Sequence, residues 1–195
     1  MIRTMLLALI LISAPLAALA QDDTKGSNPG AEHKLSIGTG IGFATPIAHS
    51  TVLDRGETGF EWQLDVMYRI TKAIAVGAWM QVVPVNNFVG FSLTGEARYH
   101  FNFLQSRKGF LGKLTPYVGG GIGLYHVGGP SGFFSYDGLL FSFPVGIEFD
   151  LTDRIALTNE MRFNFMAAAN KNIPGDRLSD TFYYSWQMIG ARFRF

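Results

Sequence analysis

The sequence predicts an all-β protein, an eight-stranded antiparallel up-and-down transmembrane β-barrel in a chain of 195 residues. Segments of about ten residues alternate apolar and polar side chains, which is the period of two of a strand with two different faces. Short and longer connections alternate between these segments, as the hairpins of such a barrel require. The chain has 17 phenylalanines and 23 glycines. A barrel in lipid accommodates both, because the rings can face lipid while the glycines face a narrow lumen.

The composition excludes several classes of function. There is no cysteine, so disulfides, thiolate metal sites and cysteine nucleophiles are absent. The net charge is +1, and removal of Arg3 with a signal peptide would leave 15 basic and 15 acidic residues, which gives no reason to expect nucleic acid as a partner. We expect no cofactor and no metal site, because the histidines are scattered along the chain: His33, His49, His100 and His126.

The first 20 residues have the features of a secretory signal peptide. Arg3 precedes the apolar run Met5–Ile12, and Ala18 and Ala20 give the small-x-small cleavage pattern. The alternative, a membrane-spanning helix, is disfavoured because the run is shorter than the roughly 20 apolar residues that a span needs. We therefore predict a signal peptide over residues 1–20.

The next stretch contains a leader and the first strand. Residues 21–32 are polar and predict a flexible periplasmic leader, so residues 33–195 remain for the barrel domain. The first strand begins at Leu35, where apolar side chains alternate with glycines, and ends at Pro46, which cannot donate to a sheet ladder.

The second and third strands form the first tight hairpin. After the polar loop Pro46–Gly59, the strand Phe60–Ile70 has six apolar residues on one face, with only Met67 out of keeping on the other. The turn Thr71–Ala73 leads to Ile74–Val83, whose alternate residues are again apolar.

The fourth strand follows a turn at Pro84–Phe88 and is predicted over Val89–Phe101, where the alternation holds over a dozen residues. The connection Asn102–Leu114 is longer and contains three basic residues. The fifth strand, Thr115–His126, has an inward face of tyrosines and glycines.

The remaining strands complete the count of eight. The loop Val127–Asp137 precedes the sixth strand, Leu139–Leu151, in which Pro144 must either break one rung of the ladder or mark a bulge. The turn 152–154 leads to Ile155–Phe165, where Asn159 falls unexpectedly on the apolar face, and the polar loop Ala167–Asp180 precedes the closing strand Tyr183–Phe195.

The closing strand is regular only in its last part. Phe193 and Phe195 share one face and alternate with basic residues on the other. Counting back from Phe195 sends Ser185 toward lipid and Trp186 toward the lumen, opposite to expectation. Either a bulge near Met188 reverses the facing, or Trp186 plugs the lumen.

The polar face of the strands is predicted to line the lumen. A soluble, lipocalin-like barrel is disfavoured because the apolar faces are crowded with large aromatic rings, whereas an eight-stranded lumen is only just wide enough for its own side chains. The inward charges are nearly balanced in sign, as a buried polar core requires. They are Glu61, Asp65, Arg69, Glu96, Arg98, Glu148, Asp150, Glu160, Arg162, Arg192 and Arg194.

The last residues resemble the carboxy-terminal assembly signal of bacterial outer-membrane β-barrel proteins. Gly190 stands five residues before the terminal aromatic Phe195, and Phe193 precedes it by two, although Met188 replaces the usual polar residue. With the strand count and the segment Thr115–Gly123, the chain resembles the small eight-stranded outer-membrane barrels of the OmpA/OmpX type, often called porin-family proteins.

This resemblance implies a location in the outer membrane of a Gram-negative-type bacterium. The implied partners are outer-membrane lipids, the barrel assembly machinery and an unknown ligand at the extracellular loops, and we expect a monomer. Both termini would be periplasmic, so Asn102–Leu114 would be a periplasmic turn, longer than the family's usual turns.

Two glycine-rich segments and two sets of loop residues are candidate sites. Gly38–Gly42 and Gly119–Gly123 open no helix, so we interpret them as inward glycine stripes rather than phosphate loops. Possible nucleophilic triads are His126 with Ser131 and Asp137, and His49 with Ser50 and Asp54. Since these residue types are common in loops and no signature of lipid A deacylases is present, we predict no catalytic residue.

The predicted function is that of a structural or surface-interaction protein of the outer membrane, with a static plug of inward charges. One alternative is a narrow porin-like channel for water, ions or small solutes, in which the charge pairs rearrange. A second alternative is a lipid-modifying hydrolase of the outer membrane.

Overall fold

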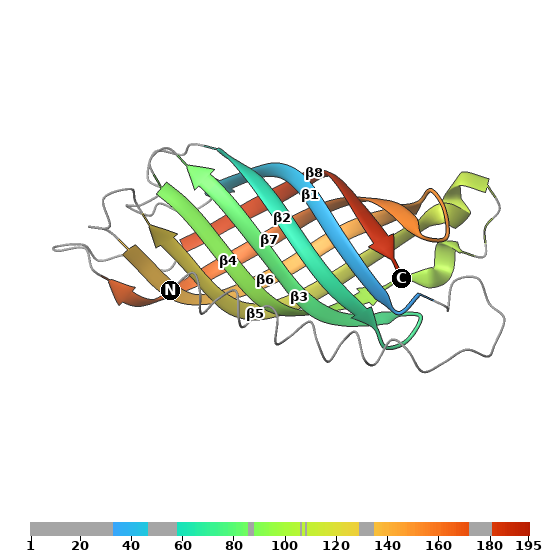
Figure 1. The fold of residues 1–195 in the computed structure, drawn as a ribbon, viewed down its shortest axis with the longest axis horizontal. Helices are drawn as coiled ribbons and strands as arrows, with labels where there is room; N and C mark the ends of the chain where they lie inside the picture. The colour runs from blue at the N-terminus through green and yellow to red at the C-terminus, as the bar shows by residue number, and fades with distance from the viewer. Residues whose placement is uncertain are drawn as a thin grey trace.

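A computed structural model describes residues 33–46, 58–85, 88–105, 107, 109–128, 135–171 and 181–195. Within this part, eight antiparallel strands pair in sequence order and β8 pairs back onto β1, which closes a barrel of tilted strands (Figure 1). The predicted fold class is confirmed. The predicted signal peptide, its cleavage residues Ala18 and Ala20, and the predicted leader lie outside the described residues.

The strand bounds are close to those predicted, with two exceptions. β7 continues to Lys171 and β6 begins at Ser135, because the two strands keep pairing past the predicted loop start at Ala167. The other six strands begin and end within two residues of the prediction. The strands are β1 (Leu35–Pro46), β2 (Gly59–Arg69), β3 (Ile74–Val85), β4 (Phe88–His100), β5 (Leu114–Gly128), β6 (Ser135–Asp150), β7 (Ile155–Lys171) and β8 (Thr181–Arg194).

The two faces of the barrel are inverted relative to those of a soluble protein. On β2, Glu61 is 0% exposed, whereas its neighbours Phe60 and Trp62 are 49% and 37% exposed. The same alternation recurs around the barrel, with leucine, isoleucine, valine and phenylalanine side chains outside and polar side chains inside. An outer surface of this kind is suited to lipid, and a closed barrel leaves no strand edge unpaired in it.

A β-bulge in β8 resolves the facing of its first half. The pairing of β8 with β1 shifts by one residue at Met188, and both Met188 and Ile189 face outward, at 42% and 66% exposure. Two consecutive outward residues reverse the alternation before them. Ser185 is therefore buried and Trp186 is exposed at the outer surface, so the bulge explanation is correct and Trp186 does not plug the lumen.

The same bulge explains the polar residue on the outer face of β7. Asn159 donates from Nδ2 to the carbonyl oxygen of Met188 at 2.9 Å and accepts from Nε1 of Trp186 at 3.3 Å. A carbonyl released from the ladder would otherwise lie unpaired at a lipid-facing position, which is costly. Asn159 thus satisfies a polar group that the bulge creates.

Pro144 breaks a rung of the ladder and makes no bulge. The pairs Val118 with Val145 and Gly121 with Ser142 have the same register, while the positions between them, which include Pro144, are unpaired. The missing N–H of proline accounts for this gap. On the other side, Pro144 still lies opposite Arg162 of β7.

The long β4–β5 connection contains two short 3-10 helices, η1 (Asn102–Leu104) and η2 (Gly109–Lys113). It lies at the same end of the barrel as the carboxy terminus (Figure 1). Phe103 and Phe110 are each 65% exposed, and the Phe110 ring lies 5.0 Å from that of Phe149. No helix among the described residues is long and apolar enough to cross a membrane.

Candidate functional site in the barrel lumen

The barrel has a terminal end, where β1 begins and β8 ends, and a distal end, where β1 ends and β8 begins. Among the predicted interior charges, nine are joined by ion pairs inside the lumen. These are Asp65, Glu96, Arg98, Glu148, Asp150, Glu160, Arg162, Arg192 and Arg194. Glu61 and Arg69 have no such pair within the described residues.

Arg162 of β7 lies at the middle of the lumen. Its Nη1 is 2.5 Å from Oε2 of Glu96 and its Nη2 is 2.7 Å from Oε1 of Glu160. Nη1 also donates to the Ser142 hydroxyl at 2.9 Å, and the guanidinium lies 3.8 Å from the centre of the Trp79 ring. All of these side chains are buried, so the guanidinium has a partner on its edge and on its face.

Arg98 of β4 completes what we call the central cluster, namely Glu96, Arg98, Glu160 and Arg162. Its Nε contacts Glu96, and its Nη2 lies 3.4 Å from Glu160. The Tyr117 hydroxyl donates to Glu160 at 2.6 Å. The cluster holds two cations and two anions from β4 and β7, strands that do not pair with each other, so it bridges the lumen.

A second group, the terminal cluster, lies nearer the chain ends and consists of Asp65, Glu148, Asp150, Arg192 and Arg194. Arg192 binds both carboxylate oxygens of Asp65 at 2.9 Å and also contacts Glu148. Arg194 lies 2.6 Å from Glu148 and 2.7 Å from Asp150. Nη2 of Arg192 donates to both Asp65 oxygens while Nη1 contacts Glu148, so the guanidinium bridges two carboxylates and its orientation is fixed.

Glu61 has polar but uncharged surroundings. Its Oε2 accepts a hydrogen bond from the Gln81 amide, whose oxygen accepts one from the Tyr183 hydroxyl at 2.9 Å. Its Oε1 has no hydrogen-bond partner although the residue is 0% exposed. Glu61 therefore differs from Glu96, which contacts two guanidinium groups.

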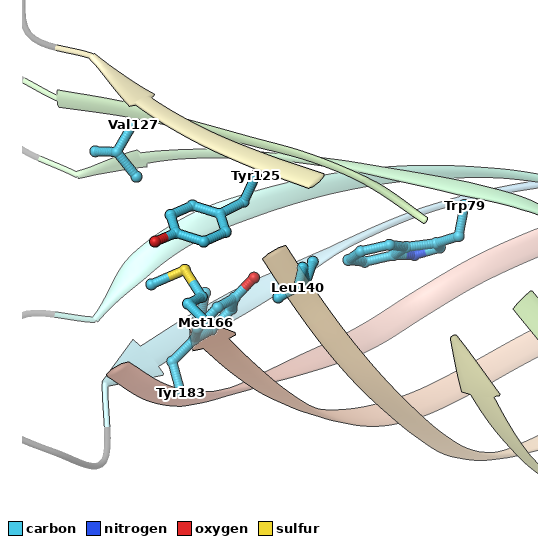
Figure 2. Close-up of a cluster of buried hydrophobic side chains, with 7 residues drawn as sticks. Trp79, Tyr125, Val127, Leu140, Met166 and Tyr183 are labelled. Atoms are coloured by element: carbon cyan, nitrogen blue, oxygen red, sulfur yellow. The ribbon is translucent and has the colours of Figure 1, made fainter. Parts of the chain in front are cut away.

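The distal half of the lumen contains a cluster of apolar side chains beside buried polar ones such as Glu61 and Gln81. Figure 2 shows Tyr125, Met166 and Tyr183 converging near Leu140, with Trp79 farther along the lumen. The complete apolar cluster is Ala44, Trp79, Tyr125, Val127, Leu140, Met166 and Tyr183. The sequence analysis did not name Trp79 as an inward residue. Its spacing of two residues from Gly77 and from Gln81, which share the inner face of β3, would have been enough to predict that its ring enters the lumen.

The inward glycines make room for these large side chains. A Cβ at Gly146 would lie 2.5 Å from the Tyr117 hydroxyl oxygen, and a Cβ at Gly38 would lie 2.5 Å from an Asp65 oxygen. The segments 38–42 and 119–123 lie inside β1 and β5, as the interpretation of glycine stripes requires. Close approach is the observed use of glycine at these two positions.

The residues of the predicted assembly signal occupy both faces of β8. Phe193 and Phe195 are 43% and 62% exposed on the outer side, and Gly190 is buried on the inner side. A Cβ at Gly190 would clash with the Thr158 hydroxyl oxygen. These positions give each residue a packing role, and recognition by the assembly machinery stays a prediction.

One pair from the predicted triads is brought together. Nδ1 of His126 lies 2.5 Å from Oδ1 of Asp137, across paired positions of β5 and β6, and both side chains are partly exposed. Ser131 and the second set, His49, Ser50 and Asp54, lie outside the described residues. Within the described part of the chain, no group of three or more histidine and acidic side chains is arranged to hold a metal ion.

Comparison of the structure with solved proteins shows the same fold in small outer-membrane barrels. Neisserial surface protein A is 16% identical, matches 88% of this chain and 100% of its own, and has a TM-score of 0.65. The N-terminal β-barrel domain of OprF from Pseudomonas aeruginosa is 12% identical, matches 84% of this chain and 98% of its own, and has a TM-score of 0.52. No family model and no curated protein sequence matches the chain.

The shared fold agrees with the physical character of the surface. A closed antiparallel barrel of eight strands with an apolar outer face is a structure of outer membranes. The chain therefore has the fold of the small eight-stranded outer-membrane β-barrels, with an outer face suited to lipid.

Proposed function

We propose that this protein is a non-conducting outer-membrane barrel that acts as a structural and surface-interaction protein through its extracellular loops. The observation that carries the proposal is the central cluster, which bridges the lumen from β4 to β7 with ion pairs between buried side chains. Such a cluster is a static plug, because moving one member leaves the others buried without a counter-charge.

Packing on both sides supports this plug. Tyr117 and Trp79, each 1% exposed, lie against the guanidinium groups of Arg98 and Arg162. The apolar cluster fills the next part of the lumen toward the distal end. A path for ions through this region would require several large side chains to move together.

Planar-bilayer recording of the purified, refolded protein tests the proposal against the alternative of a narrow channel. We expect no reproducible unit conductance from the wild type, with a known porin refolded in the same way as the positive control. A reproducible unit conductance in the wild type that Glu96→Gln or Arg98→Ala abolishes would show that the cluster is a gate.

We further propose that the protein is a monomer held by outer-membrane lipids and inserted by the barrel assembly machinery. The closed ladder, with β8 paired to β1, leaves no strand edge for a second copy. Size-exclusion chromatography with light scattering, corrected for detergent, is expected to give one chain per particle. A stable dimer at all protein concentrations would contradict this.

The His126–Asp137 pair favours one second candidate function, a lipid-modifying hydrolase. A carboxylate beside the imidazole Nδ1 orients a histidine that acts as general base on a serine. Lipid A from cells with and without the protein can be compared by mass, with Asp137→Asn as the matched variant. A mass change that requires Asp137 would support this candidate, and identical profiles would end it.

A further inference from the structure

We propose that the β4–β5 connection is a membrane anchor that binds anionic phospholipid at the terminal end of the barrel. The proposal rests on the proposed function, because it requires a barrel that is held by outer-membrane lipids. The connection, which we call the basic turn, spans residues 101–113, contains η1 and η2, and is described at residues 101–105, 107 and 109–113. Its position beside the carboxy terminus (Figure 1) places it where the lipid-facing strands β4, β5 and β6 reach the end of the barrel.

Hydrogen bonds and two glycines fix the backbone of the basic turn. Nδ2 of Asn102 donates to the carbonyl oxygen of Lys72 at 3.1 Å, which ties the basic turn to the β2–β3 turn, residues 70–73. Gly109 has a φ of 75°, a conformation that favours glycine, and a Cβ at Gly112 would clash with the carbonyl oxygen of Arg107. The turn therefore presents its side chains from a defined backbone.

Large apolar side chains of the basic turn are exposed and continue the lipid-facing surface of the barrel. Phe103 and Phe110 are each 65% exposed, and Leu111 is 51% exposed. The centre of the Phe103 ring lies 6.3 Å from that of Phe101, which continues the outer row of β4, and the Phe110 ring lies 5.0 Å from that of Phe149 on the outer face of β6. Phenylalanine and leucine side chains in such a position are suited to the boundary between headgroups and acyl chains.

The turns at the terminal end are basic, in contrast to the connections at the distal end. The three terminal turns hold five basic residues and one acidic residue in the sequence: Lys72, Arg107, Lys108, Lys113, Arg154 and Asp153. The four distal connections hold two basic and four acidic residues: Arg55, Arg177, Asp54, Glu57, Asp176 and Asp180. The basic turn contributes three of the five terminal cations and no acid, so its charge complements an anionic lipid surface.

The cations of the basic turn lie beside its apolar surface. Arg107 and Lys113 are exposed, and among the described residues neither lies within ion-pair distance of a carboxylate. Nζ of Lys113 lies 6.0 Å from the centre of the Phe149 ring, against which Phe110 packs. A lipid whose acyl chain contacts these rings therefore has its phosphate near a cation. A zwitterionic headgroup carries a cation of its own, so an anionic phospholipid fits this surface better.

Native mass spectrometry tests the choice of lipid. The refolded protein is released from neutral-detergent micelles that contain equal amounts of phosphatidylglycerol and phosphatidylcholine, and the retained lipids are counted. We expect at least about fivefold more phosphatidylglycerol than phosphatidylcholine, as two basic side chains near an anionic headgroup predict. In the double variant Arg107→Gln with Lys113→Gln, the preference should fall below about twofold.

The matched control is the double variant Lys72→Gln with Arg154→Gln. It removes two exposed charges from the β2–β3 turn and from the β6–β7 turn, residues 151–154, at the same end of the barrel. Because these charges lie outside the basic turn, the preference for phosphatidylglycerol should stay above about threefold, as for screened surface charges.

A single fluorophore tests whether the basic turn lies at the membrane boundary. The chain has no cysteine, so Leu111→Cys gives one labelling position in protein refolded into vesicles that contain phosphatidylglycerol. We expect a nitroxide on the lipid acyl chain to quench the label at least about threefold more than a water-soluble nitroxide, as insertion to the acyl boundary predicts. A label at Asp153→Cys, in the exposed β6–β7 turn, should show the reverse order.

Folding of each variant is checked by the difference in gel mobility between unheated and boiled samples. If a double variant does not fold, Arg107→Gln and Lys113→Gln are tested singly, and each should lower the preference at least about twofold. Failure of the wild type to insert into vesicles would contradict the proposed function. An inserted wild type without a preference for phosphatidylglycerol, an equal loss in the two double variants, or quenching of the Leu111→Cys label mainly from water would overturn the membrane anchor.

Discussion

The two halves of the lumen are filled by different chemistry. From the middle to the terminal end, the central and terminal clusters neutralise four guanidinium groups with five carboxylates. Toward the distal end, apolar side chains such as Leu140, Met166 and Tyr125 form a cluster beside uncompensated polar groups such as Glu61. Trp79 marks the boundary, because its ring lies on Arg162 while it belongs to the apolar cluster.

The comparison shows two ways to fill the lumen of a barrel of eight strands. The apolar half depends on volume, so its stability should fall with each methylene removed. The charged half depends on complete pairing, because a buried charge without its partner costs more than the pair contributes. The same chemical change should therefore have different effects in the two halves.

The largest effect is expected for Glu96→Gln in the central cluster. This change leaves Arg98 and Arg162 with Glu160 as their main counter-charge, in a region with almost no solvent. Loss of one partner from a buried pair costs about 3–5 kcal/mol. Urea unfolding in lipid vesicles, followed by tryptophan fluorescence, measures the free energy of unfolding. A loss below about 1 kcal/mol would show that water or a neighbouring group compensates the charge.

A smaller loss is expected for Leu140→Ala in the apolar half. Leu140 is 0% exposed and packs in the distal cluster, so its truncation leaves a cavity and costs about 2–4 kcal/mol. The same unfolding experiment applies, and Leu139→Ala, on the outer face of the same strand at 44% exposure, serves as the matched control. Equal losses in the two variants would mean that the distal lumen is loosely packed.

The smallest effect is expected for Glu61→Gln, which repeats the chemistry of Glu96→Gln at a site without a cation. The oxygen of the introduced amide can still accept the hydrogen bond from Gln81, and no ion pair among the described residues is broken. We expect a change below about 1 kcal/mol, as for a polar substitution that preserves its hydrogen bond. If both variants lose several kcal/mol, the two halves of the lumen do not differ in their dependence on charge.

Regular alternation was enough to predict most of the barrel. It located eight strands, and it sent Glu96, Arg162 and Arg192 to the inner side because side chains on a strand alternate strictly. Strict alternation breaks down at β8, where the bulge at Met188 adds one residue and reverses the facing of Ser185 and Trp186. The sequence left a bulge near Met188 and an inward Trp186 as alternatives, because a bulge depends on pairing with neighbouring strands and the local sequence could not decide between them.

The sequence by itself determined the fold class, the inner and outer faces and the near balance of inward charge, because these depend on short-range periodicity and composition. Only the tertiary structure decided which charges meet. Arg162 and Glu96 are 66 residues apart and come together through barrel closure and strand register. The same closure left Glu61 without a cation and placed Asn159 on the bulge carbonyl, since pairing register is a property of the whole sheet.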